Sequence, residues 1–275
     1  MFIEKLRKVF IGIFVGAFVL FGYAFIEPYW LAIATIPFVS PDIPASFDGT
    51  TLVFVSDIHH GPFFARWRVA KLVDKINRLH PDLVVFGGDY VHRDPKYIIP
   101  CFEELQRVQA PLGKFGVLGN HDHWENAALT RQEMLRAGIT ILDNLAVWIV
   151  QGQERIKIGG VGDLWEDVQD LTPTLEGVEE HDFVILVSHN PDYAEHLTTD
   201  KIDLMLCGHT HGGQVTLFGQ WAPFVPSRYG QKYRAGLIKT AHTRVIVTTG
   251  VGTVTPPVRF FARPEIVKII LKRAI

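Results

Sequence analysis

The chain has 275 residues, of which 48% are hydrophobic, and this is enough for one large globular domain with a sizeable core. Its 27 basic and 29 acidic residues leave a formal net charge of −2, which argues against a protein that coats nucleic acid. The two cysteines, Cys101 and Cys207, are too few for a disulfide framework or a Cys-x-x-Cys metal knuckle. We expect both to be small buried residues, although one disulfide between them is conceivable.

The N-terminal region differs from the rest of the chain. An uncharged apolar stretch covers residues 9–26, and 18 such residues are just enough to cross a bilayer as a helix. We interpret residues 1–30 as an uncleaved transmembrane anchor, single-pass and in the cell (inner) membrane. The basic residues before it predict an N-terminus on the inside and a domain on the outside: Lys5, Arg7 and Lys8.

Two other interpretations of this stretch stay open. It could be a cleaved signal peptide, because Ala32-Ile33-Ala34 resembles a cleavage site, but the apolar core is longer than usual. It could also be a buried helix of a soluble protein, although nothing polar marks an outward face. If the helix spans the membrane, Gly12-x-x-x-Gly16 could pack two copies into a weak homodimer.

Prolines follow the apolar stretch, and they predict a linker over residues 31–49 before a single domain over 50–275. Within that domain, short β-branched runs predict strands, and helical spacing of apolar residues predicts a helix over 66–80. A second helix is expected from Thr130 to Ala137, ending at Gly138. Three apolar runs within 139–160 lack intervening helices and suggest antiparallel pairing. The expected strands cover 51–56, 82–87, 114–119, 183–188, 203–208 and 244–249.

Metal-binding residue types follow five of these strands, and this is the strongest signal in the sequence. The strands and helices expected above predict an α/β layered domain, and in such domains the functional residues lie at the ends of the strands. One pair, His209 and His211, could bind one metal or two, or could lie in a surface turn. The five motifs are Ser56-Asp57-Ile58-His59-His60-Gly61, Gly87-Gly88-Asp89, Gly119-Asn120-His121-Asp122, Ser188-His189-Asn190-Pro191 and Cys207-Gly208-His209-Thr210-His211.

Together these motifs resemble the signature of the calcineurin-like metallophosphoesterases, and the resemblance covers residues 50–275. It implies a four-layer αββα sandwich. The runs "GDLW" (162–165), "SHNPD" (188–192) and "LCGHTHGGQ" (206–214) are similar to the bacterial membrane-associated YaeI/YkuE-like branch. That branch includes phosphodiesterases and some UDP-2,3-diacylglucosamine pyrophosphatases.

The resemblance also implies a ligand set for two divalent metal ions. One ion would be bound by Asp57, His59, Asp89 and His211, and the other by Asp89, Asn120, His189 and His209. A carboxylate such as Asp89 has two oxygens and can bridge a pair of cations. The mixed nitrogen and oxygen donors favour Mn²⁺, with Fe, Zn or Mg²⁺ also compatible.

By the same resemblance, His121 is the catalytic residue, and it stabilises the transition state or protonates the leaving oxygen. Asp122 is expected to orient the His121 ring. A hydroxide held between the two metals would attack phosphorus in line, without a covalent phosphoenzyme. His60 is either a substrate contact or a histidine of the turn.

Two segments mix bulky aromatics with basic residues beside these motifs, at 61–68 and 217–236. Their aromatic side chains either fill the core or form an amphipathic rim that accepts an acyl chain or touches a membrane. In the second case Arg66, Arg68 and Arg228 are candidate phosphate contacts.

These observations predict a membrane-anchored metal-dependent hydrolase, specifically a phosphodiesterase or pyrophosphatase. The expected substrate is a lipid-linked or nucleotide phosphoester such as UDP-2,3-diacylglucosamine, an intermediate of lipid A biosynthesis. One alternative is a broad-specificity phosphodiesterase, a cyclic-nucleotide phosphodiesterase or a nuclease of the same fold, although nucleic acid is not an expected partner. An alternative of another class is a non-catalytic metal-binding scaffold.

Overall fold

Two six-stranded sheets form the centre of the molecule in the computed structural model, which describes residues 2–274. The order in the first sheet is β1 (Ala32–Ser40), β12 (Glu265–Arg273), β2 (Thr51–Val55), β3 (Leu83–Phe86), β4 (Lys114–Gly116) and β5 (Ile139–Ile141). The order in the second is β10 (Gly236–Lys239), β11 (Arg244–Val247), β9 (Leu204–Cys207), β8 (Val184–Val187), β7 (Glu154–Gly160) and β6 (Ala146–Gln151).

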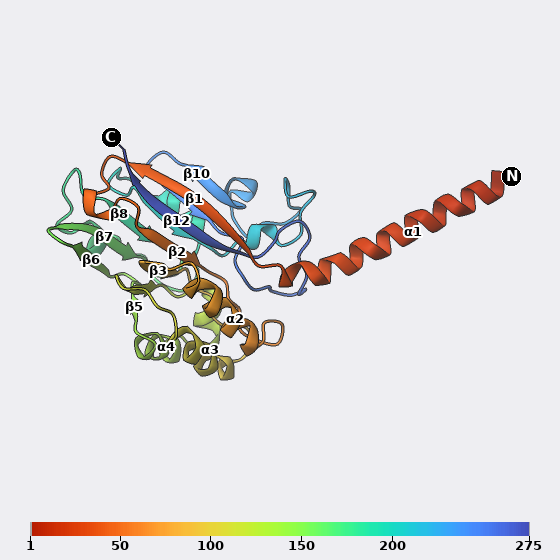
Figure 1. Cartoon of the computed structure of the whole chain (residues 1–275), viewed down its shortest axis with the longest axis horizontal. Coiled ribbons are helices and arrows are strands. Elements are labelled where there is room, and N and C mark those ends of the chain that lie inside the picture. Colours follow the sequence, from red (N-terminus) through yellow and green to blue (C-terminus); the bar gives the residue numbers. More distant parts are fainter. Residues whose placement is uncertain (1, 275) are drawn as a thin grey trace.

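The sheets pack face to face, and helices cover their outer faces, so the predicted αββα layering is confirmed (Figure 1). Side chains from both sheets, such as Phe54 and Ile185, fill the space between them. The first sheet is covered by α2 (Arg66–Asn77), α3 (Ile98–Leu105) and α4 (Asn120–Arg136). The layer over the second sheet is thin and consists of α5 (Thr172–Leu175), short 3-10 turns such as Pro191–His196, and loops.

The helices show which patterns were informative. Helix α2 buries Val69, Leu72, Val73 and Ile76 at the expected spacing and ends three residues before the predicted boundary. Helix α4 begins at Asn120, ten residues earlier than predicted, and its backbone departs from helical geometry at Asn126. Its first turn was hidden because it carries polar candidate ligands instead of a periodic apolar face.

The run at 139–141 was assigned to the wrong pairing. Strands β6 and β7 form the expected antiparallel pair, but β5 pairs in parallel with β4 in the other sheet. The chain crosses from one sheet to the other over residues 142–145, so adjacent apolar runs belong to different layers. Cys101 and Cys207 are both buried free thiols, as expected.

The predicted linker over 31–49 is contradicted by β1, which pairs in parallel with β12 over nine residues. Pro37 lies inside this strand. Proline is tolerated there because β1 is an edge strand, whose second side has no sheet partner to receive a hydrogen bond. The folded domain therefore begins at β1, well before the predicted boundary at residue 50.

Helix α1 (Phe2–Ile26) extends away from the rest of the molecule as a single rod (Figure 1). None of its described residues is buried, which excludes the interpretation as a core helix. The stretch Phe2–Tyr29 contains an 18-residue window with a mean hydropathy of 2.5, so it is long and apolar enough to cross a membrane. The Gly12-x-x-x-Gly16 homodimer stays a prediction.

Candidate metal centre

The predicted metal ligands converge at the carboxyl ends of β2, β3, β8 and β9 and at the start of α4. Parallel strands end at the same edge of a sheet, so residues far apart in sequence meet there. All seven predicted ligands are buried: Asp57, His59, Asp89, Asn120, His189, His209 and His211.

One group of donors comes from the first and last motifs. The Nε2 atoms of His59 and His211 lie 3.0 Å apart. The Oδ1 atom of Asp57 lies 3.4 Å from Nε2 of His211 and 3.9 Å from Nε2 of His59. These three side chains are close enough for their ligand atoms to share one ion.

A second group lies beside the first. Nδ1 of His209 lies 3.1 Å from Oδ1 of Asn120 and 3.2 Å from Nε2 of His189. The same Nε2 of His189 is 3.2 Å from Oδ2 of Asp89. His209 and His211 therefore belong to different groups, which excludes the surface-turn interpretation of their motif.

Asp89 lies between the two groups. Its Oδ2 atom, 3.2 Å from His189, is also 3.5 Å from Nε2 of His59. Its Oδ1 atom accepts a hydrogen bond of 2.9 Å from the backbone N–H of His121, which fixes the carboxylate. Asp89 therefore lies where its carboxylate could contact an ion in either group.

The protonation states of the histidines fit metal binding. Burial lowers the pKa of His209 to about 3 and holds those of His59 and His211 well below the usual value, so these rings are neutral and their lone pairs are free. Nδ1 of His189 lies 2.7 Å from the carbonyl oxygen of Gly87, which can only accept, and this directs Nε2 toward the cluster.

His189 differs from the other three histidines. Burial opposes its charged form, but the carboxylates of Asp89, Asp57 and Asp163 together raise its pKa well above the usual value. The positive charge that these carboxylates attract is the charge that a bound cation would supply. A neutral-imidazole and carboxylate donor set of this kind suits a divalent ion.

The backbone at the cluster is strained. Within residues 2–274, eleven non-glycine residues have positive φ, and five of them are predicted ligands, namely Asp57, His59, Asp89, His209 and His211. Each such conformation costs about 1–3 kcal/mol and persists only where the surroundings impose it. A Cβ on Gly208 would come within 2.4 Å of the Asp57 carboxylate, and one on Gly119 within 2.3 Å of that of Asp89.

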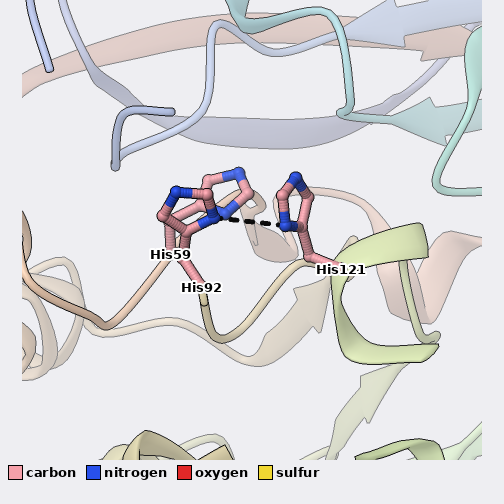
Figure 2. Close-up of side chains that lie close together, drawn as sticks. All are labelled: His59, His92 and His121. Atoms are coloured by element: carbon pink, nitrogen blue, oxygen red, sulfur yellow. Dashed lines mark hydrogen bonds between the residues drawn. The ribbon is translucent and has the colours of Figure 1, made fainter. Parts of the chain in front are cut away.

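His121 lies at the edge of the cluster and is half-buried. Its ring centroid is 4.8 Å from that of His59. Its Nδ1 atom is 3.2 Å from Nδ1 of His92, and the three rings lie close together, each edge-on to the next (Figure 2). His92 is buried and belongs to none of the strand-end motifs, so the sequence does not single it out as part of this cluster. Its signal was the spacing of three residues after Asp89, which no ligand motif included.

The expected role of Asp122 is contradicted by its hydrogen bonds. Its carboxylate accepts from the backbone N–H groups of Asp89, Tyr90 and Gly119, at 2.8–2.9 Å. Both oxygens are occupied by the backbone of the two loops that carry Asp89 and Asn120. Asp122 therefore positions these loops, and the residue beside the His121 ring nitrogen is His92.

Three of the four candidate substrate contacts are engaged elsewhere. Nδ1 of His60 bonds to the Phe64 carbonyl, and Arg66 forms ion pairs with Glu103 and Glu104. Arg68 is buried and donates to the carbonyls of Pro28 and Phe63. These side chains were selected for nearness in sequence, but the turn after His59 directs them away from the metal ligands.

Arg228 keeps an exposed side chain, and its turn lies near the cluster. Its backbone N–H is held by Asp192, and the carbonyl of Pro226 faces His209. The indole of Trp165 packs edge-on against the same His209 ring at 4.3 Å. The aromatic residues of the predicted rim differ in burial. Phe64 is in the core, whereas Trp221 and Phe224 are exposed.

Comparison with known proteins agrees with this geometry. A family profile described as calcineurin-like phosphoesterase matches residues 50–213, more than half of the chain. The uncharacterized metallophosphoesterase YkuE of Bacillus subtilis (strain 168) is 34% identical over 261 residues, covering 92% of this chain and 90% of YkuE. Phosphodiesterase YaeI of Escherichia coli (strain K12) is 32% identical over 263 residues, covering 91% of this chain and 92% of YaeI.

A transmembrane protein with metallophosphoesterase domain from Danio rerio is 31% identical over 245 residues, which cover 84% of this chain and 55% of that protein. The matched residues include every strand-end motif of the candidate metal centre up to Gly213. The chain therefore belongs to the calcineurin-like phosphoesterase family and is a metal-dependent phosphoester hydrolase.

Proposed function

We propose that this protein is a membrane-anchored phosphoesterase that uses two divalent ions, with Mn²⁺ expected, to cleave a phosphodiester or pyrophosphate bond of an amphipathic substrate. The observation that carries the proposal is the short connection between α1 and the metal-binding loops. A substrate embedded in the bilayer could reach such a site without leaving the membrane completely.

Arg259 makes this connection, and it is fully buried. Its backbone N–H donates to the carbonyl of Ala24, in the last turn of α1. Its guanidinium donates to the carbonyls of Gly250 and Gly252, and it lies 3.5 Å from that of His211. The backbone N–H of Gly252 in turn donates to the carbonyl of Asp57, so the backbone and side chain of one residue join the anchor to two predicted ligands.

Exposed aromatic side chains surround the same end of α1, and they support contact with a bilayer. The ring of Tyr23 lies 5.6 Å from that of Phe261, which lies 5.6 Å from that of Phe218. Phe218 is 73% exposed, and Trp221 and Phe224 follow it along the chain. Aromatic residues are typical of the boundary between membrane and water.

The residues of the site suggest how they divide the chemistry. Two bound divalent ions would neutralise phosphate oxygens and activate a water. Asp57, Asp89 and the neutral histidines hold the positive charge in place. His121 is free to protonate the leaving oxygen, while the neighbouring Nδ1 of His92 orients its ring. Arg228, with its exposed guanidinium, is the remaining candidate for binding a phosphate oxygen.

The family branch and the name of the relative YaeI, a phosphodiesterase, support a diester or pyrophosphate as the substrate class. UDP-2,3-diacylglucosamine is the leading named candidate because it combines acyl chains with a pyrophosphate. One observation opposes it. The basic residues in the first turns of α1 predict a catalytic domain on the outside, whereas UDP-sugars are cytoplasmic. An external lipid phosphate is therefore the alternative substrate within this class.

The test uses the full chain in detergent, stripped of metal and reconstituted with Mn²⁺. We expect hydrolysis of an aryl phosphodiester, loss of activity with a chelator, and release of UMP from UDP-2,3-diacylglucosamine. A reporter fused to the C-terminus reports the side of the membrane. His242→Ala, at a partly exposed histidine paired with Asp200, is the matched control for variants of the site.

Undiminished turnover after exhaustive chelation, with no metal left by elemental analysis, would contradict the two-metal mechanism. An external C-terminus together with no UMP release would remove the named substrate and leave the broader activity. Faster cleavage of a cyclic nucleotide or of DNA than of any lipid phosphate would favour the alternative activities. Metal binding without hydrolysis of any phosphoester would favour the scaffold.

A further inference from the structure

A cavity of about 630 Å³ lies where α1 joins the domain, on the side of helix α2. It is bordered by Pro28 and Tyr29, immediately after α1, and by one face of α2. Val251 also borders it and belongs to the loop that packs against Asp57. None of the predicted metal ligands lines the cavity, so this site differs from the metal centre.

Basic side chains line one wall of the cavity. Arg68, Lys71, Lys75 and Arg78 follow one another at spacings of three, four and three residues, which places them on one face of α2. Interaction with the negative end of the helix explains basic residues in its last turn but not Arg68 and Lys71. The acidic residue of this wall, Asp74, is already paired with Arg107 at 2.6 Å.

Two of these cations have their charge available. Lys71 and Arg78 are exposed, and within residues 2–274 neither side chain forms a hydrogen bond or an ion pair. Lys75 donates to the carbonyl of Leu31 and Arg68 to that of Pro28, each at 2.5 Å. Lys71 and Arg78 are therefore free to bind an anion. Lys75 and Arg68 instead connect α2 to the segment that follows α1.

Aromatic rings form the rest of the wall. The guanidinium of Arg68 lies between the rings of Tyr29 and Phe64, at 4.4 and 4.1 Å. The half-exposed ring of Trp67 lies under Lys71, whose Nζ is 4.7 Å from the ring centroid. A wall of this kind offers apolar surface and positive charge side by side.

We propose that this cavity binds the phosphate headgroup of an anionic phospholipid from the bilayer that α1 enters. The location of the cavity beside α1 favours a lipid over a soluble phosphate, because the acyl chains of a lipid bound here can lie along the exposed apolar surface of α1. The bound headgroup holds the domain, and with it the metal centre, at a fixed height above the membrane. The proposal rests on the membrane insertion of α1 proposed above, but not on the substrate.

The test measures tryptophan fluorescence of the full chain in neutral detergent micelles as brominated lipid is added. Brominated phosphatidylglycerol is compared with brominated phosphatidylcholine, and Trp67→Phe identifies the signal from the cavity. The test variant carries Lys71→Glu and Arg78→Glu. The control carries Lys239→Glu and Lys272→Glu, which make the same change of charge near the opposite end of β1.

We expect phosphatidylglycerol to quench the Trp67 signal at about tenfold lower concentration than phosphatidylcholine, because two available basic residues attract its anionic headgroup. The test variant should lose this preference and the control should keep it. Equal quenching by both lipids, or a preference that survives in the test variant, would overturn the proposal. Displacement of the brominated lipid by inorganic phosphate at low millimolar concentration would overturn the assignment to a lipid.

Hydrolysis of a soluble aryl phosphodiester is measured in the same samples, because it depends on the metal centre alone. Equal activity of the two double variants, with a lipid preference only in the control, separates this site from catalysis. Carbonate extraction of membranes that contain the full chain reports the insertion of α1 independently. A failure of the lipid site is thus distinguishable from a failure of the anchor or of the enzyme.

Discussion

The metal centre and the junction, by which we mean residues 24–31 with Arg68 and Arg259, both bury charged or polar side chains, but they treat them differently. At the junction the guanidinium of Arg259 donates to the carbonyls of Thr249, Gly250, Gly252 and Ala262. At the metal centre, Nδ1 of His59, Nδ1 of His211 and Nε2 of His209 have no hydrogen-bond partner within residues 2–274.

This difference separates a structural use of buried charge from a functional one. Burial lowers the pKa of Arg68 and of Arg259 to about 10, so both stay charged at neutral pH and their carbonyl partners are needed for the fold. Unpaired imidazole nitrogens and positive φ angles at the ligands instead cost stability. An ion bound between the nitrogens that face one another, Nε2 of His59 and of His211, would offset this cost, although the unpaired nitrogens lie on the other side of each ring.

The largest expected effect is on catalysis at the edge of the metal centre. His121→Ala should reduce turnover by about 10²–10⁴-fold, as for the loss of an acid or base group, and should leave the metal content unchanged. Steady-state kinetics and elemental analysis on the same sample measure both quantities. The control is His242→Ala, at a partly exposed histidine far from the predicted ligands in sequence. Near-normal turnover of His121→Ala would remove this residue from the mechanism.

Substitutions at the junction should lower the stability of the fold. Arg259→Met leaves several buried carbonyls without a donor, and we expect it to lower the free energy of unfolding by about 3 kcal/mol or more. Arg155, which is half-exposed and stacks on Trp148, provides the control Arg155→Met, with a change below about 0.5 kcal/mol. Denaturant unfolding of the full chain in detergent measures both. An unchanged midpoint for Arg259→Met would show that its contacts do not support the fold.

Asp122 lies at the metal centre, but its carboxylate is fully hydrogen-bonded like the buried charges of the junction, so its substitution should affect both stability and metal binding. In Asp122→Asn, an amide N–H₂ would face at least one of the three backbone donors, so we expect a loss of about 1–3 kcal/mol in stability together with lower metal occupancy. A variant with unchanged stability and metal content but reduced turnover would instead restore the role of orienting the His121 ring. Asp170→Asn, at an exposed aspartate that caps a turn, is the control.

The sequence predicted the metal centre far better than the edges of the fold. Each strand-end motif combines a short apolar run with ligand residue types, and those two signals are local. Strand β1 was missed because Pro37 resembles a breaker, and because each of its residues pairs with a residue of β12 that lies 233 positions later, from Ala32 with Glu265 to Ser40 with Arg273. The position of His92 and the hydrogen bonds of Asp122 depend on how two loops pack together, which no local pattern contains.

The central claim is that the buried, incompletely hydrogen-bonded side chains of the metal centre bind two ions with Asp89 between them. Elemental analysis of the full chain after reconstitution with Mn²⁺ and removal of free metal tests it most directly. We predict two ions per chain in the natural protein and fewer in Asp89→Asn, because the amide removes the negative charge of the bridge. A natural protein that retains one ion or none, or an Asp89→Asn variant that retains two, would contradict the account.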